Sequence, residues 1–206
     1  MIYVTTYHSP IGNITLAAEG QSLIGAWFEG QKYYMAGIYL DETADIGRDN
    51  CDISDIYIGS DIIDQNDKRA SEIITASDYP VLSQTCEWLG RYFDSERPNP
   101  LEIPMSPRGT QFQHLVWEHL CRIPYSCTTS YGTIAKELAA EMGITRMSAQ
   151  AVGGAVGHNP ISIIIPCHRV IGTNQALTGY AGGLDKKIWL LRHERAHYFY
   201  HIHSIL

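Results

Sequence analysis

The chain has 206 residues, of which 45% are hydrophobic, and this composition is ordinary for a globular protein with a sizeable core. No apolar stretch approaches the ~20 residues of a membrane-spanning helix. The N-terminus also lacks the basic flank and apolar run of a signal peptide. The net charge of −7 at first argues against a nucleic-acid partner. These features predict a cytoplasmic protein that does not bind membranes.

The charge is divided unevenly along the chain. Residues 1–107 hold 6 Lys and Arg against 17 Asp and Glu, whereas residues 108–206 hold 9 against 5. An asymmetry of this kind is typical of a chain with one part that binds a polyanion. The alternative is that a solvated acidic insertion makes the first half negative. Charge alone does not decide between the two.

The first 28 residues alternate apolar and polar positions in three short runs, with turn residues at 10–13 and 19–21. This pattern predicts an antiparallel meander of three strands. The rhythm breaks from about residue 38 to 78, where 11 acidic residues stand against three basic ones. We expect an acidic loop or irregular insertion there.

A helix is predicted from Pro80, which suits a first helical turn, to Phe93, because the apolar positions between them form a helical stripe. Two proline-containing segments, 97–100 and 104–107, then flank a short piece that we expect to be extended and to act as a linker. The sequence thus predicts an α+β protein. An N-terminal domain of residues 1–103 precedes a mainly helical domain of residues 104–206.

Three further helices are expected before the chemical centre. Thr110 can cap a helix that ends near Ile123, and Ser130 can cap a helix from 131 to about 140. A turn at 142–145 leads to a third helix, about 148–156, made almost entirely of Ala and Gly. Helix, turn and helix are typical of a helix-turn-helix. The small side chains favour either tight helix packing or close approach of the backbone to nucleic acid, and the composition does not choose.

The apolar run 161–165 predicts a buried strand that delivers Cys167 and His168 to its end. A thiolate is a strong nucleophile, and a neighbouring imidazole can activate it. Since adjacent residues of an extended chain point to opposite sides, this pair needs a turn or a bridging water. Glu194 closes a helix expected at 184–194 and can orient His168, although an ordinary solvated carboxylate is the simpler interpretation.

The other four cysteines, Cys51, Cys86, Cys121 and Cys127, are interpreted as small apolar filler, because their spacing is irregular and the chain has no Cys-x-x-Cys pair. A zinc ribbon and a disulfide framework are therefore not expected.

Residues 165–172, Ile-Pro-Cys-His-Arg-Val-Ile-Gly, resemble the active-site signature of the O6-alkylguanine-DNA alkyltransferases, the methylated-DNA–protein-cysteine methyltransferases. Four more segments resemble that family in the same order, and the similarity runs in register over about residues 108–195. They are Gly109-Thr110-Gln111-Phe112-Gln113, Ser130-Tyr131-Gly132, Ala151-Val152-Gly153-Gly154-Ala155 with Asn159-Pro160, and Leu177-Thr178-Gly179-Tyr180.

This resemblance implies a ribonuclease H-like N-terminal domain and assigns a role to each matching residue. Cys167 would accept the alkyl group irreversibly, His168 would take the thiol proton through a water, and Glu194 would hold the imidazole. Asn159 would brace the site, and Tyr131 would assist departure of the guanine. The substrate-binding positions would be Val170, Tyr180, Ala181 and Gly182.

The resemblance also implies double-stranded DNA containing O6-alkylguanine as the partner, a monomer, and no metal or organic cofactor. The helix-turn-helix would lie in the minor groove while the target nucleotide is flipped out. Gln150 stands where the family often has an arginine that fills the vacated stack, and it lacks the charge and planar fork of arginine. The DNA-binding positions would be Ser130, Arg146, Gln150, Ala151, Gly153, Gly154 and Arg169.

Three other functions compete with this one. A damage-binding relative without chemistry would lack the acceptor cysteine, which is present here. A cysteine hydrolase would not need the DNA-side motifs. A transcription factor using only the helix-turn-helix would resemble sensor proteins that carry additional metal-binding domains, and no clustered Cys set suggests one.

Overall fold

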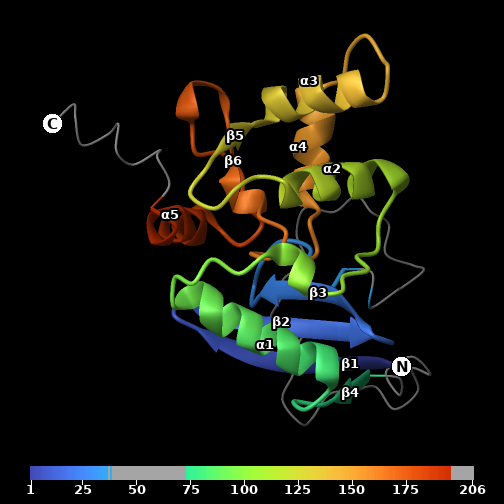
Figure 1. Ribbon diagram of the computed structural model, residues 1–206, viewed down its shortest axis with the longest axis vertical. Coiled ribbons are helices and arrows are strands. Elements are labelled where there is room, and N and C mark those ends of the chain that lie inside the picture. Colours follow the sequence, from blue (N-terminus) through green and yellow to red (C-terminus); the bar gives the residue numbers. More distant parts are fainter. Residues whose placement is uncertain (37, 39–72, 196–206) are drawn as a thin grey trace, which may run out of the picture.

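A computed structural model describes residues 1–36, 38 and 73–195. The N-terminal part contains a four-stranded sheet, which lies beneath helix α1 (Pro80–Phe93) in Figure 1. Strands β1 (Ile2–Ser9), β2 (Gly12–Glu19) and β3 (Ser22–Phe28) form the predicted antiparallel meander. The sheet order is β3-β2-β1-β4. Helix α1, also predicted, packs across one face of the sheet (Figure 1).

In its described part, the segment expected to be an acidic insertion contains a short strand. Residues 73–75 form β4 (Ile73–Thr75), which pairs in parallel with β1. The prediction of irregular structure up to residue 78 was therefore wrong at this end, because tertiary pairing with an edge strand outweighs weak local propensity. Residues 39–72, the rest of the insertion, lie outside the described part of the chain.

The piece between the two proline segments is not extended. It forms the 3₁₀ helix η3 (Pro100–Glu102), because the side chain of Asn99 accepts a hydrogen bond from Leu101 N–H and the Glu102 carboxylate accepts one from Asn99 N–H. The chain then runs along the free edge of β3, where Leu23 N–H donates to Pro104 O and Ser106 N–H donates to Leu23 O.

The C-terminal part is mainly helical. Thr110 caps helix α2 (Gln111–Cys121), Ser130 caps α3 (Tyr131–Glu141) and Ser148 caps α4 (Ala149–Gly157), close to the predicted bounds. Helices α3 and α4 contact each other across the connection 142–148, and α2 contacts both. Short parallel strands β5 (Thr129–Ser130) and β6 (Val170–Ile171) and helix α5 (Leu184–His193) complete this part (Figure 1).

The run 161–165 is buried, as predicted, but it is not a strand. Ile163 has a φ of 71°, and Ile165 N–H donates to Ile161 O, so the segment folds into a compact turn. Only Ile161 pairs with the sheet, through an isolated bridge to Ala26. An apolar run this short does not reveal by periodicity alone whether it is a strand or a buried turn.

One continuous hydrophobic core joins the two parts. It includes Leu16 of β2, Trp88 of α1, Trp117 of α2 and Leu190 of α5, together with the buried turn. The segment that follows the turn and carries Cys167 is therefore held from both sides. Within the described residues, no helix combines the length and apolar character needed to cross a membrane.

Candidate active site

The buried turn delivers Cys167 into a short 3₁₀ helix. After Pro166 the chain forms η4 (Cys167–Arg169), so that adjacent side chains do not alternate as they would on a strand. The side chains of Cys167, His168 and Arg169 are all buried, and Cys167 keeps 5% of its surface exposed. The three residues of one turn thus point to different partners.

Asn159 holds the sulfur of Cys167. Its Oδ1 accepts a hydrogen bond from Ile161 N–H at 3.0 Å, which fixes the orientation of the side-chain amide. The Nδ2 group then donates to Ile165 O at 2.9 Å and lies 3.0 Å from Cys167 Sγ. Because a thiolate accepts hydrogen bonds better than a thiol does, this donor favours the ionised form of Cys167.

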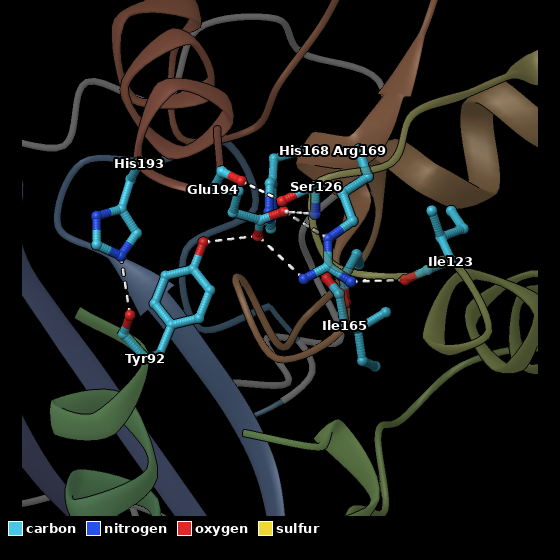
Figure 2. Close-up of polar contacts among 9 residues, drawn as sticks. Tyr92, Ile123, Ser126, Ile165, His168, Arg169, His193 and Glu194 are labelled. Atoms are coloured by element: carbon cyan, nitrogen blue, oxygen red, sulfur yellow. Dashed lines mark hydrogen bonds and ion pairs between the residues drawn. The ribbon is translucent and has the colours of Figure 1, made fainter. Parts of the chain in front are cut away.

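His168 and Glu194 form a buried pair, shown in Figure 2. His168 Nε2 lies 2.7 Å from Glu194 Oε1, and neither side chain is exposed. An ionised carboxylate can only accept hydrogen bonds, so Nε2 carries the hydrogen and Nδ1 has the free lone pair. Nδ1 is buried and has no hydrogen-bonding partner in the described part of the protein. The imidazole is therefore in the tautomer that can act as a base through Nδ1.

Glu194 is also surrounded by other donors (Figure 2). Tyr92 Oη donates to Oε1 at 2.8 Å, and Ser126 N–H donates to Oε2 at 3.3 Å. Arg169 donates through Nε at 2.9 Å and through Nη2 at 3.0 Å, which makes a bidentate ion pair. The simpler interpretation of Glu194 as a solvated carboxylate is wrong, because it lies at the centre of a buried network.

The assignment of Arg169 to the DNA-binding surface needs correction. Its guanidinium is buried, and besides the two bonds to Glu194 it donates through Nη1 to Ile123 O at 2.6 Å. All three nitrogens are used within the protein. Arg169 therefore supplies the charge that balances Glu194 and is not placed to contact a phosphate.

The electrostatics favour a neutral Cys167 and a neutral His168 at rest. Burial raises the pKa of the Cys167 thiol, although the Asn159 hydrogen bond and the charge of Lys187 act in the opposite direction. Burial likewise lowers the pKa of His168, against the pull of Glu194. Burial alone would raise the pKa of Glu194, but His168 and Arg169 together hold it well below its usual range. The Glu194 carboxylate is therefore ionised and can stabilise a positive charge that forms on His168 during a reaction.

Cys167 lies on a cavity of about 300 Å³, and several predicted residues share it. Tyr131 at the start of α3 lines it, and its hydroxyl donates to Thr178 O at 3.4 Å. The other predicted residues in the lining are Gly153, Gly154, Tyr180 and Ala181. Helix α4 and the loop before α5 therefore form walls around the sulfur.

Other predicted residues lie outside this cavity. Gln150 and Arg146 are exposed and line a separate groove between α3 and α4. Val170 is buried, and its carbonyl accepts from Lys187. The remaining three are Ala151, exposed on α4; Ser130, which caps α3; and Gly182, packed against Phe28 and Tyr180.

Sequence reasoning missed Lys187, which is fully buried near the site. Its ammonium donates to Val170 O at 2.6 Å, to Thr178 O at 2.9 Å and to Gly179 O at 3.3 Å, and so ties β6 to the loop that lines the cavity. Burial lowers the pKa of Lys187 to about 8. A signal was available, because Lys187 lies one helical turn before Leu191 on the buried face of α5.

The sequence of the chain is similar to those of known proteins. Residues 111–196 match the family model of the 6-O-methylguanine DNA methyltransferase DNA-binding domain, and residues 2–45 match that of the ribonuclease-like domain. A methylated-DNA–protein-cysteine methyltransferase of Haemophilus influenzae is 32% identical over 96% of this chain and 88% of its own length. One of Mycobacterium tuberculosis is 35% identical over 95% of this chain and 94% of its own length. The chain belongs to the methylated-DNA–protein-cysteine methyltransferase family.

Solved structures agree with this family membership. The crystal structure of M. tuberculosis O6-methylguanine methyltransferase superposes with a TM-score of 0.65 at 33% identity and covers 95% of this chain and 93% of its own. A complex of the M. tuberculosis protein with DNA gives a TM-score of 0.66 at 33% identity, covering 94% and 92%. The α+β methyltransferase fold predicted from the sequence is thus confirmed.

Proposed function

We propose that this methyltransferase repairs DNA by transferring the alkyl group of O6-alkylguanine to Sγ of its own Cys167. The observation that carries this proposal is the position of Sγ, which lies on the cavity, 3.0 Å from the Asn159 amide, and next along the chain to a histidine held by an ionised glutamate. Methylated-DNA–protein-cysteine methyltransferase is also the name of the relatives that match over nearly the whole chain.

The reaction is an in-line displacement at the alkyl carbon. The bond from Sγ to carbon forms while the bond from carbon to O6 breaks, and its electron pair stays on the guanine oxygen. The thiol proton passes through a bridging water to Nδ1 of His168, whose positive charge Glu194 stabilises. Because the product is a thioether that water does not hydrolyse, each molecule reacts once.

The leaving guanine needs a proton or hydrogen bond at O6, and Tyr131 is the candidate donor. Tyr131 lines the same cavity as Cys167. Within the described residues, the one hydrogen bond of its hydroxyl is the weak contact to Thr178 O at 3.4 Å. Burial raises the pKa of Tyr131, which keeps the hydroxyl protonated. A neutral donor aimed at the developing negative charge lowers the barrier to departure.

Cys167 is almost fully buried and lies on a cavity, so its Sγ cannot reach a base stacked inside a duplex, and the target nucleotide has to be flipped out of the stack. Helix α4 is suited to lie against DNA because Gly153 and Gly154 line the cavity and Gln150 and Ala151 are exposed beside it. We further propose that the protein acts as a cytoplasmic monomer on double-stranded DNA, with residues 1–103 and 104–206 as its two domains. The separate family matches to 2–45 and 111–196 support this division.

The decisive experiment is mass spectrometry after mixing the protein with a duplex oligonucleotide that carries O6-methylguanine. One added methyl group per chain, mapped to the Cys167 peptide and not increasing with time, is the expected result. The Cys167→Ala variant is the matched control and should gain no methyl group while still binding the duplex. DNA binding without any mass change in the wild type would instead indicate a damage-binding protein.

A further inference from the structure

The N-terminal sheet part contributes two residues to the cavity that holds Cys167. Lys32 and Tyr33 lie in the turn that follows β3 and line the cavity together with Tyr131, Tyr180 and the α4 glycines. Both are exposed, whereas Cys167 is buried, so they stand at the solvent end of the cavity. No role for them follows from the signature around Cys167 or from the helix-turn-helix.

The segment that carries these residues is anchored to both walls of the cavity. Lys32 N–H donates to Ala181 O at 3.0 Å, in the loop before α5. The ring of Tyr33 stacks on that of His158 with centroids 4.1 Å apart, and His158 Nδ1 bonds Gly154 O of α4 at 2.7 Å. The position of Lys32 is therefore defined by the same loop and helix that surround the sulfur.

The backbone of Tyr33 also indicates that this segment is held in a defined position. Tyr33 has a φ of 61°, a left-handed conformation that a bulky residue adopts at a cost of ~1 kcal/mol and that persists where surrounding contacts impose it. In this conformation the Lys32 ammonium lies 5.0 Å from the centre of the Tyr33 ring. A cation–π contact of this kind holds the charge near the opening of the cavity without neutralising it.

The charge of Lys32 is unusual in its surroundings. It is the sole Lys or Arg among the first 47 residues. Among the described residues that line the cavity, Lys32 is also the one Lys, Arg, Asp or Glu. The one Lys or Arg side chain among these 47 residues thus lies at the opening through which a flipped nucleotide has to enter. The chemical group of DNA that suits an exposed ammonium is a phosphate.

We propose that Lys32 binds a backbone phosphate beside the nucleotide that enters the cavity, and that Tyr33 positions it. This proposal rests on the proposed function, since it assigns a DNA contact to the same site. It extends the DNA-binding surface from the helix-turn-helix to the sheet part. The contact should raise the affinity for DNA and position the nucleotide without discriminating between base sequences, because a phosphate contact carries no base sequence information.

The test compares two substrates that differ in having phosphates. The rate of Cys167 alkylation is measured with an O6-methylguanine duplex at subsaturating concentration and with O6-benzylguanine, a free base without sugar or phosphate. For Lys32→Gln we expect the ratio of the duplex rate to the free-base rate to fall about fivefold, and the slope of log rate against log salt to become shallower by about one. Lys32→Arg should restore both quantities.

Arg91→Gln is the matched control. It removes one positive charge from the same part of the chain, on α1 and outside the cavity lining, where Arg91 pairs with exposed Glu102. Its rate ratio should equal that of the wild type. If Lys32→Gln keeps the wild-type ratio and salt slope, or slows both substrates equally, the phosphate contact is refuted while the repair function stands. If the wild type alkylates Cys167 with neither substrate, both proposals fail.

Discussion

Asn159 places its Nδ2 atom 3.0 Å from Cys167 Sγ, while its Oδ1 atom is fixed by Ile161 N–H at 3.0 Å. The direction of the amide is therefore determined by the backbone of the buried turn. One side chain both shapes the turn that presents the cysteine and supplies a hydrogen-bond donor to its sulfur.

Replacing Asn159 by Ala should raise the pKa of the Cys167 thiol and slow alkylation, because the developing thiolate loses its donor. Unfolding should require ~1–3 kcal/mol less free energy, since backbone groups of the turn lose a buried partner. The rate of carboxymethylation by iodoacetate against pH measures the thiol pKa, and urea unfolding measures stability. Asn13→Ala on β2 controls for loss of an asparagine elsewhere, and an unchanged Cys167 titration would refute the role of Asn159.

Replacing Glu194 by Gln should lower the unfolding free energy by ~3–5 kcal/mol, because Arg169 would remain buried without its counter-charge. Alkylation should also be slower, since the imidazolium would lose its partner. Glu141→Gln removes an exposed carboxylate that pairs with Arg122, and it should cost less than ~1 kcal/mol. Equal effects of the two variants in urea unfolding would contradict the buried network.

The same network predicts how stability depends on pH. The pKa of Glu194 is lowered in the folded protein, so its contribution is complete above the unfolded-state pKa of about 4.3 and is lost as the pH falls below that value. The unfolding free energy of the wild type should therefore decline more steeply below pH 4 than that of Glu194→Gln. Urea titrations between pH 3 and pH 7 measure both curves, and parallel curves would show that Glu194 is not held ionised.

Replacing Tyr131 by Phe should slow alkyl transfer from saturating duplex by roughly a hundredfold, the lower end of the range expected for loss of a proton donor. The hydroxyl makes only a 3.4 Å contact with Thr178 O, so urea stability should change little. Tyr79→Phe removes a hydroxyl bonded to Gly20 O, outside the cavity lining, and should leave the transfer rate unchanged. A wild-type rate for Tyr131→Phe would exclude its assistance to the leaving guanine.

Replacing Gln150 by Arg should strengthen binding to duplex DNA about threefold to tenfold. Gln150 is exposed in the first turn of α4, where a longer, charged and planar side chain could fill the vacated stack and pair with a phosphate. Gln111→Arg adds the same charge at the exposed start of α2 and should have a smaller effect. Affinity is measured by fluorescence anisotropy on the Cys167→Ala background. Equal gains for both variants would show that the added positive charge alone strengthens binding, and would contradict a specific role for position 150.

The sequence by itself determined the features that depend on neighbours along the chain. Alternation in the first 28 residues predicted β1 to β3, and the side chains of Thr110 and Ser130 marked the starts of two helices, because strand period and helix capping are local properties. The segment around Cys167 and His168 likewise carried enough local pattern to indicate the family and its chemistry.

The resemblance implied that Glu194 holds His168, but only the tertiary structure decided the rest of its surroundings. Glu194 is the acceptor of a buried network that also includes Arg169 and Tyr92. The run 161–165 became a turn, and Lys32 came to line the same cavity as Cys167, which lies 135 residues later in the chain. These outcomes depend on burial, on charge compensation and on the pairing of otherwise unsatisfied polar groups, which arise when distant segments pack together and which periodicity along the chain does not encode.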